Sequence, residues 1–79
     1  MSKSIQEIMP EACMLKLRDF VEGLQNNTLI IEPGKMIVTM LRERVLEPFR
    51  DELLKESTGV HDLHYLAIVI CKTLEIDPN

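Results

Sequence analysis

The segment from Val60 to Ile76 constrains the fold more than any other, because its pattern predicts a helix that is apolar on two opposite sides. At about 100° per residue, one apolar face carries Val60, Leu63, Leu66, Ala67, Ile70, Cys71 and Leu74. A second face, roughly opposite, carries Tyr65, Ile68, Val69 and Ile76. A helix that is apolar on two sides is normally buried on two sides. We therefore expect a helix over residues 59–76 that is either central in a bundle or shared with a second copy of the chain.

The flanks of this segment contain signals for the start and the end of a helix. Ser57 and Thr58 have hydroxyls that can cap the first free backbone N–H groups, and Gly59 follows them. Asp77 and Pro78 follow the last apolar residue, and a helix usually ends at or before the residue that precedes a proline. The expected helix therefore begins near residue 59 and ends near residue 76.

Residues 11–25 predict an amphipathic helix with a single apolar stripe. The stripe is formed by Cys13, Leu17, Phe20, Val21 and Leu24. Asn26 and Asn27 follow, and asparagine can adopt the left-handed conformation that ends many helices. Upstream, we expect residues 1–9 to be flexible or to form a short turn, opened by a capping box from Ser4 to Glu7.

Residues 35–56 also have a helical period, but their apolar stripe changes direction midway. The first face runs from Met36 to Val45, and the second, carrying Phe49 and Leu53, lies about 120° round from it. Pro48 stands at the changeover, where it disfavours α-helical geometry in the preceding residue and removes one helix hydrogen bond. We therefore expect two helices, over residues 35–47 and 48–56, that meet at a kink or break near Pro48.

Together these segments predict an all-α fold, a small helical bundle of three to four main helices with the apolar C-terminal helix as its core. We expect a single domain over residues 1–79. Residues 28–34 contain a β-branched run but no second strand for it to pair with, so they predict an extended connector laid over the core. A chain of 79 residues buries a small core, and its stability should be marginal.

Composition and charge argue against several classes of function. The formal net charge is −4, and one tyrosine, two phenylalanines and no tryptophan are present, which disfavours both a basic phosphate-binding surface and an aromatic stacking platform. The longest uncharged apolar run, residues 65–71, is seven residues long, whereas a membrane-spanning helix needs about 20. Cys13 and Cys71 fall on apolar faces, so we expect buried, reduced thiols in a cytoplasmic protein, and a single disulfide is the alternative.

No constellation in the sequence predicts catalysis, a cofactor or a metal site. His61 and His64 could share a metal ion, but Asp62 points away from both and a third ligand is missing. His64 and Cys71 are roughly 10 Å apart along a helix axis, too far for a base to contact a nucleophile. The three glycines are isolated from one another, so no phosphate-binding loop is present. We expect a non-enzymatic protein.

These features favour a small non-catalytic protein–protein interaction module, an adaptor or regulator, that forms a homodimer through its C-terminal helix. The expected interface consists of His61, Tyr65, Ile68, Val69, Lys72 and Ile76. In the competing architecture, a monomer, helix 48–56 covers this face through Phe49 and Leu53. The alternative function is a nucleic-acid-associated regulator, either a weak dimeric DNA binder using Arg42, Arg44 and Arg50 or an acidic mimic of DNA that blocks a basic partner.

Overall fold

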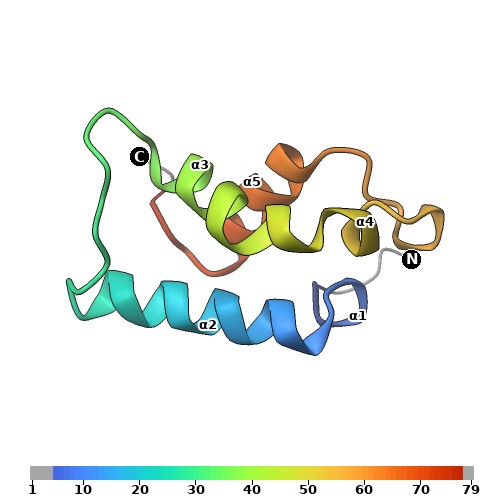
Figure 1. Cartoon of the computed structure of the whole chain (residues 1–79), viewed down its shortest axis with the longest axis horizontal. Coiled ribbons are helices and arrows are strands. Elements are labelled where there is room, and N and C mark those ends of the chain that lie inside the picture. The colour runs from blue at the N-terminus through green and yellow to red at the C-terminus, as the bar shows by residue number, and fades with distance from the viewer. Residues whose placement is uncertain (1–4, 78–79) are drawn as a thin grey trace.

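The computed structural model describes residues 5–77, and no strand occurs among them (Figure 1). The α-helices are α1 (Ile5–Ile8), α2 (Glu11–Gln25), α3 (Ile37–Leu41), α4 (Arg50–Leu53) and α5 (Leu63–Thr73). A π-helix, η1 (Arg42–Leu46), and a 3₁₀-helix, η2 (Glu47–Phe49), join α3 to α4. A second 3₁₀-helix, η3 (Glu56–Thr58), precedes α5. The all-α fold class predicted from the sequence is confirmed.

Helix α2 has the bounds that its periodicity predicts, and it buries Cys13, Leu17 and Phe20. It ends in a Schellman motif, in which Asn27 has a left-handed φ of 58° and the Thr28 N–H donates to the Gly23 carbonyl over 2.9 Å. The asparagine pair therefore ends the helix as expected. Upstream, α1 is the short turn that was predicted, and Ser4 of the expected capping box lies outside the described residues.

The helical path from α3 to α4 changes type on both sides of Pro48. The Glu47 N–H donates to the Arg42 carbonyl, a π-type bond, whereas the Arg50 N–H donates to the Glu47 carbonyl, a 3₁₀-type bond. Pro48 has no N–H to donate, so a regular α-helix cannot continue through it. The predicted discontinuity near Pro48 is confirmed, although the path is shorter than expected at both ends and covers residues 37–53.

This change of helix type allows both halves of the path to bury side chains in one core. Met40 and Leu53 are 1% and 0% exposed, although on a straight α-helix they would point about 140° apart. The largest of the almost fully buried side chains are those of Cys13, Met40, Leu41, Val45, Leu46, Leu53, Ile70 and Cys71. Helix α2 packs against η1, and α5 packs against both α3 and η1. The α3–η1 segment is thus contacted by both long helices.

Helix α5 begins later than the sequence predicted, at Leu63 and not near residue 59. Its cap is Asp62, whose carboxylate accepts a hydrogen bond from the His64 N–H over 2.9 Å. The Thr58 hydroxyl, expected to cap this helix, accepts from the Val60 N–H and donates to the Lys55 carbonyl within the preceding turn. Residues 59–62 therefore form a loop, because Thr58 closes η3 and leaves the helix to be capped by Asp62.

Helix α5 also ends earlier than predicted, at Thr73. Glu75 adopts a left-handed φ of 56°, and the Ile76 N–H donates to the Cys71 carbonyl over 2.8 Å, which completes a second Schellman motif. The sequence did not reveal this end, because glutamate rarely takes the left-handed conformation. Ile76 consequently follows the helix and does not lie on it.

Residues 28–36 form the connector between α2 and α3, and it covers less of the core than expected. Leu29 packs against the core. Ile30 and Ile31 are 78% and 54% exposed. The Gly34 φ of 80° and a hydrogen bond from the Lys35 N–H to the Glu32 carbonyl turn the chain into α3. Only the first part of the connector therefore contributes to packing.

Candidate functional site

The outer face of α5, which we define as Tyr65, Ile68, Val69 and Lys72, contains most of the interface predicted from the sequence. Tyr65 is 67% exposed, and Lys72, about two turns further along the helix, is also exposed. Ile68 and Val69 are half-buried. The two flanking residues of the predicted set lie outside the helix: His61 is exposed in the preceding loop, and Ile76 is half-buried in the segment that follows.

Helix α4 and the preceding η2, which could have covered this face in a monomer, pack against the core instead. Leu53 of α4 is fully buried, and Phe49 of η2 packs against the same core. Ile68 also packs against the core, whereas Tyr65 stays largely exposed. The α4 side chains therefore stabilise the core and leave the centre of the outer face of α5 open.

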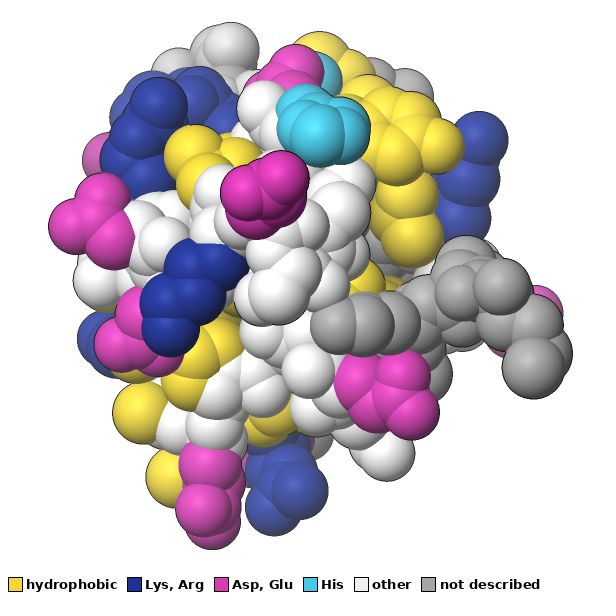
Figure 2. All heavy atoms as spheres, turned by 90° about the vertical axis from the view of Figure 1, so that its right-hand side faces the viewer, with side chains coloured by type: hydrophobic (Ala, Val, Ile, Leu, Met, Phe, Trp, Pro, Cys, Tyr) yellow, Lys and Arg dark blue, Asp and Glu magenta, His cyan; other side chains and the backbone are white. Residues whose placement is uncertain are grey.

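A groove with a volume of about 890 Å³ lies beside this face, between the first half of α5 and the loop that precedes it. Its apolar lining consists of Ile8, Val60, Tyr65, Leu66 and Val69. Glu56, His61 and Asp62 contribute polar side chains to the same groove. Figure 2 shows hydrophobic side chains beside a histidine, with acidic side chains nearby, at the end of the molecule that carries α4. The groove extends the outer face of α5 into a hollow with an apolar lining and an acidic edge.

Part of this groove could not be found from the sequence, for two reasons. Residues 59–62 were expected to be helical, whereas they form a loop that supplies Val60 and His61 to one wall. The N-terminal turn was also not expected to reach this region, although Ile8 of α1 lines the groove and Met9 is only 5% exposed. The spacing of Ile5 and Ile8, which places them on one side of a helical turn, was the signal available for this contact.

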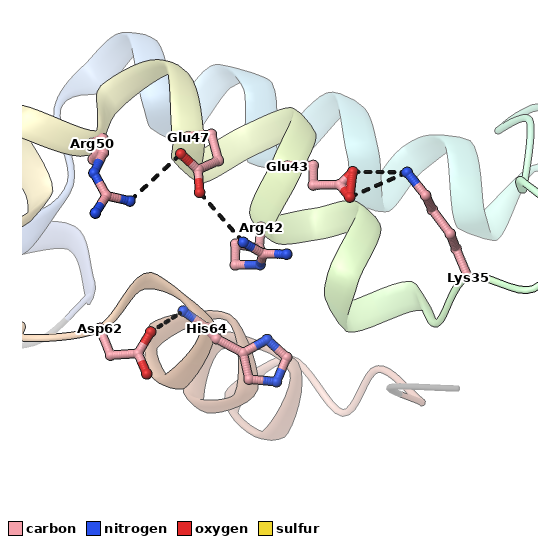
Figure 3. Close-up of polar contacts among 7 residues, drawn as sticks. All are labelled: Lys35, Arg42, Glu43, Glu47, Arg50, Asp62 and His64. Carbon is pink, nitrogen blue, oxygen red and sulfur yellow. Dashed lines mark hydrogen bonds and ion pairs between the residues drawn. The ribbon is translucent and has the colours of Figure 1, made fainter.

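Two of the three arginines on the α3–α4 path, and Lys35 just before it, contact carboxylates (Figure 3). Glu47 lies between two arginines, 3.4 Å from Arg42 and 3.7 Å from Arg50. Lys35 contacts Glu32 at 2.7 Å and Glu43 at 2.9 Å. Hydrogen bonds to these two carboxylates raise the pKa of Lys35, and the same contact lowers the pKa of Glu32. Two of the three arginines considered for DNA contact therefore share one carboxylate, that of Glu47.

The two thiols are buried and not joined by a disulfide, as the sequence predicted. The Cys13 thiol donates to the Val45 carbonyl over 3.5 Å. Burial raises the pKa of Cys13 to about 11, with a smaller contribution from Glu52, and it raises the pKa of Cys71 as well. Both thiols are therefore protonated near neutral pH, where an unactivated thiol is a poor nucleophile.

The two histidines stand at the start of α5 and have different surroundings. His61 lies at the groove, whereas His64 uses its backbone N–H in the Asp62 cap. Over residues 5–77, no group of three or more His, Cys, Asp or Glu side chains is placed to hold a metal ion. None of the helices in the described part of the chain is long and apolar enough to cross a membrane.

We compared the chain with protein-family models, with curated proteins and with solved structures, and none of the three comparisons gave a match.

Proposed function

We propose that this protein is a small non-catalytic interaction module that self-associates through the outer face of α5. The observation that supports this most directly is the position of Tyr65, which is 67% exposed in the first turn of the apolar helix α5. Ile68 and Val69 flank it on the same side, and the apolar groove continues the surface. Contiguous exposed apolar surface rimmed by polar groups commonly marks a protein-binding site.

The energetics of a small fold favour covering such a surface. Burying a few hundred Å² of apolar surface contributes several kcal/mol at about 25 cal/mol per Å², before the costs of association. A chain of 79 residues buries only a small core, so the stability that this core provides is marginal and further apolar burial would add to it. A second copy supplies an apolar surface of matching size, because the same face is present on both subunits.

Neither the two thiols nor the charged side chains of the α3–α4 path favour catalysis or direct DNA binding over a protein-binding role. The thiols are buried with raised pKa values, and Glu43 and Glu47 on the α3–α4 path contact Lys35 and Arg42. Direct DNA binding needs basic side chains that are free to contact phosphate, whereas Arg42 and Arg50 are paired with Glu47. We therefore carry only the self-association proposal forward.

Sedimentation velocity over low to high micromolar concentrations tests this proposal. We expect the wild type to be a concentration-dependent dimer and Val69→Asp to be a monomer, because a carboxylate at this position would be desolvated in the interface. Leu15→Asp is the matched control, because Leu15 is 51% exposed on α2 and away from this face. Far-UV circular dichroism checks that each variant is folded. Tyr65→Ser, at a more exposed position, replaces Val69→Asp if the latter unfolds. A wild type that stays monomeric at high micromolar concentration would contradict the proposal.

A further inference from the structure

We propose that the groove beside α5 binds a segment of a partner protein in which an apolar side chain is flanked by lysine or arginine. Such a partner goes beyond self-association, because its chemistry differs from that of a second copy of this chain. Three features of the groove support it: the apolar lining, the carboxylates at the edge and the exposed tyrosine ring that borders it.

The apolar lining of the groove is suited to an aliphatic or aromatic side chain. Val60 of the loop and Leu66 and Val69 of α5 supply apolar contacts, and Ile8 of α1 adds another from the N-terminal turn. The volume of about 890 Å³ falls within the range of about 300–1,000 Å³ that is typical of ligand-binding hollows. An apolar side chain that enters this groove leaves water, which is the driving force for binding.

The charged groups at the edge of the groove are the carboxylates of Glu56 and Asp62, and no lysine or arginine of residues 5–77 lines it. Over the same residues neither carboxylate takes part in an ion pair. Asp62 uses one oxygen to accept the His64 N–H over 2.9 Å, and its second oxygen is available to an ammonium or guanidinium group. A cationic side chain next to the bound apolar one would therefore meet an unpaired negative charge.

Tyr65 provides a further contact for a cation. Its side chain lines the groove and is 67% exposed. The face of an aromatic ring attracts ammonium and guanidinium groups that lie within about 6 Å of its centre. The ring and the two carboxylates are thus independent features of one groove, and both favour a basic partner.

The charge of the whole chain favours a partner other than a second copy for the groove. The formal net charge is −4, with 13 acidic and 9 basic residues. Lys35, Arg42 and Arg50 already contact carboxylates within the chain. Interfaces generally place opposite potentials against each other and disfavour like-charged partners. The outer face of α5 differs from the groove in this respect, because its four residues include Lys72 and no carboxylate.

Titration with short peptides tests the proposal through the emission of Tyr65, the one tyrosine of a chain without tryptophan. The probe is a short blocked peptide of leucine and lysine, which does not itself fluoresce. We expect a saturable change in emission, with a dissociation constant below about 1 mM at about 0.1 M salt. Peptides of the same length with glutamate in place of lysine, or serine in place of leucine, should bind about tenfold more weakly. The protein is held at low micromolar concentration, where the monomer predominates.

Two pairs of carboxylate substitutions locate the binding site. Glu56→Gln with Asp62→Asn removes both charges at the groove and keeps an oxygen for the helix cap. We expect this pair to weaken binding of the leucine–lysine peptide about fivefold. The matched control is Asp19→Asn with Glu22→Gln, which removes two exposed carboxylates on α2. It should change the dissociation constant by less than about twofold, because salt screens charges that are distant from the groove.

Val60→Ser tests the apolar lining at a residue that belongs to the groove and not to the outer face of α5. We expect it to weaken binding about threefold or more, because the peptide loses apolar contact. Leu15→Ser on α2 is the control, and it should leave binding unchanged because Leu15 is 51% exposed away from the groove. Far-UV circular dichroism checks the fold, and Val60→Ala replaces Val60→Ser if the latter unfolds.

Three results would overturn the proposal. Equal binding of the lysine and glutamate peptides would mean that the carboxylates do not select the partner. Equal effects of the two carboxylate pairs would mean that the peptide responds to net charge and not to the groove. Absence of saturable binding would also overturn it, and a dimer that Val60→Ser then weakens would identify a second copy as the occupant. Self-association is judged separately, by sedimentation of the wild type without peptide, so either proposal can fail alone.

Discussion

The carboxylate of Asp62 accepts a hydrogen bond from the backbone N–H of His64 over 2.9 Å, and this bond fixes where α5 begins. Because the helix starts at Leu63, the residues before it are free to turn away and form one wall of a groove. The same residue therefore ends a loop, starts a helix and contributes to the candidate interaction surface. Its position connects the local structure of the chain to the proposed function.

The Asp62 cap should make a measurable contribution to stability. Asp62→Ala removes the acceptor for the His64 N–H, and loss of such a cap costs about 1 kcal/mol. Asp62→Asn is the control, because its side-chain oxygen can accept the same bond. Urea denaturation at low protein concentration, where the monomer predominates, should rank Asp62→Ala below both Asp62→Asn and the wild type. Equal stability of the Ala and Asn variants would contradict the assigned cap.

The left-handed conformation of Glu75 predicts a stabilising substitution. Its φ is 56°, and glycine takes this conformation without the strain that a side chain imposes. Glu75→Gly should therefore be more stable than Glu75→Ala by about 1 kcal/mol, and both variants remove the same charge. Thermal denaturation of the pair gives the difference. If the alanine variant is the more stable one, the helix does not end in the conformation described.

The core role of α4 can be separated from the alternative in which this segment covers α5. Leu53 is fully buried, whereas its neighbour Leu54 is only half-buried. We expect Leu53→Ala to lower the free energy of unfolding by about 2–5 kcal/mol, and Leu54→Ala to cost clearly less. Chemical denaturation measures both values. Similar losses for the two variants would mean that Leu53 is not the residue that anchors this segment.

Burial of Cys13 predicts that stability falls at high pH. Its pKa is raised from 9.0 to about 11 in the folded protein, so the unfolded chain loses this proton first as the pH rises. The stabilising contribution is therefore fully present below pH 9 and is lost as the pH rises towards 11. Urea denaturation at several pH values should show a steeper decline for the wild type than for Cys13→Ala. Parallel declines would contradict the buried, protonated thiol.

The predictions from the sequence were correct where a single strong local signal marked the element or its end. The apolar stripe of α2 and the asparagine pair after it gave the correct bounds, and Pro48 marked the change of helix type. At the start of α5 two caps competed, because both Thr58 and Asp62 can accept a backbone N–H. The structure uses Thr58 within the preceding turn, where its hydroxyl also donates to the Leu53 carbonyl over 2.8 Å, and leaves Asp62 to cap the helix.

Only the part of the candidate surface that lies on one helix could be predicted from the sequence. Helical periodicity alone identified the second apolar face of α5, and it placed Tyr65 and Val69 together. The groove beside them also needs Ile8, which is more than fifty positions away in sequence. Contacts between such distant residues depend on how the helices pack, and a single sequence contains no direct record of that packing.

If two copies meet through the outer face of α5, Tyr65 becomes buried, and intrinsic fluorescence can measure this burial directly. The chain has one tyrosine and no tryptophan, so its aromatic emission on excitation near the tyrosine maximum reports on Tyr65. We would measure quenching of this emission by acrylamide from low to high micromolar protein concentration. We expect quenching to become weaker as the concentration rises in the wild type and in the control Leu15→Asp, and much less so in Val69→Asp. Quenching that does not change with concentration in the wild type would contradict the proposed self-association.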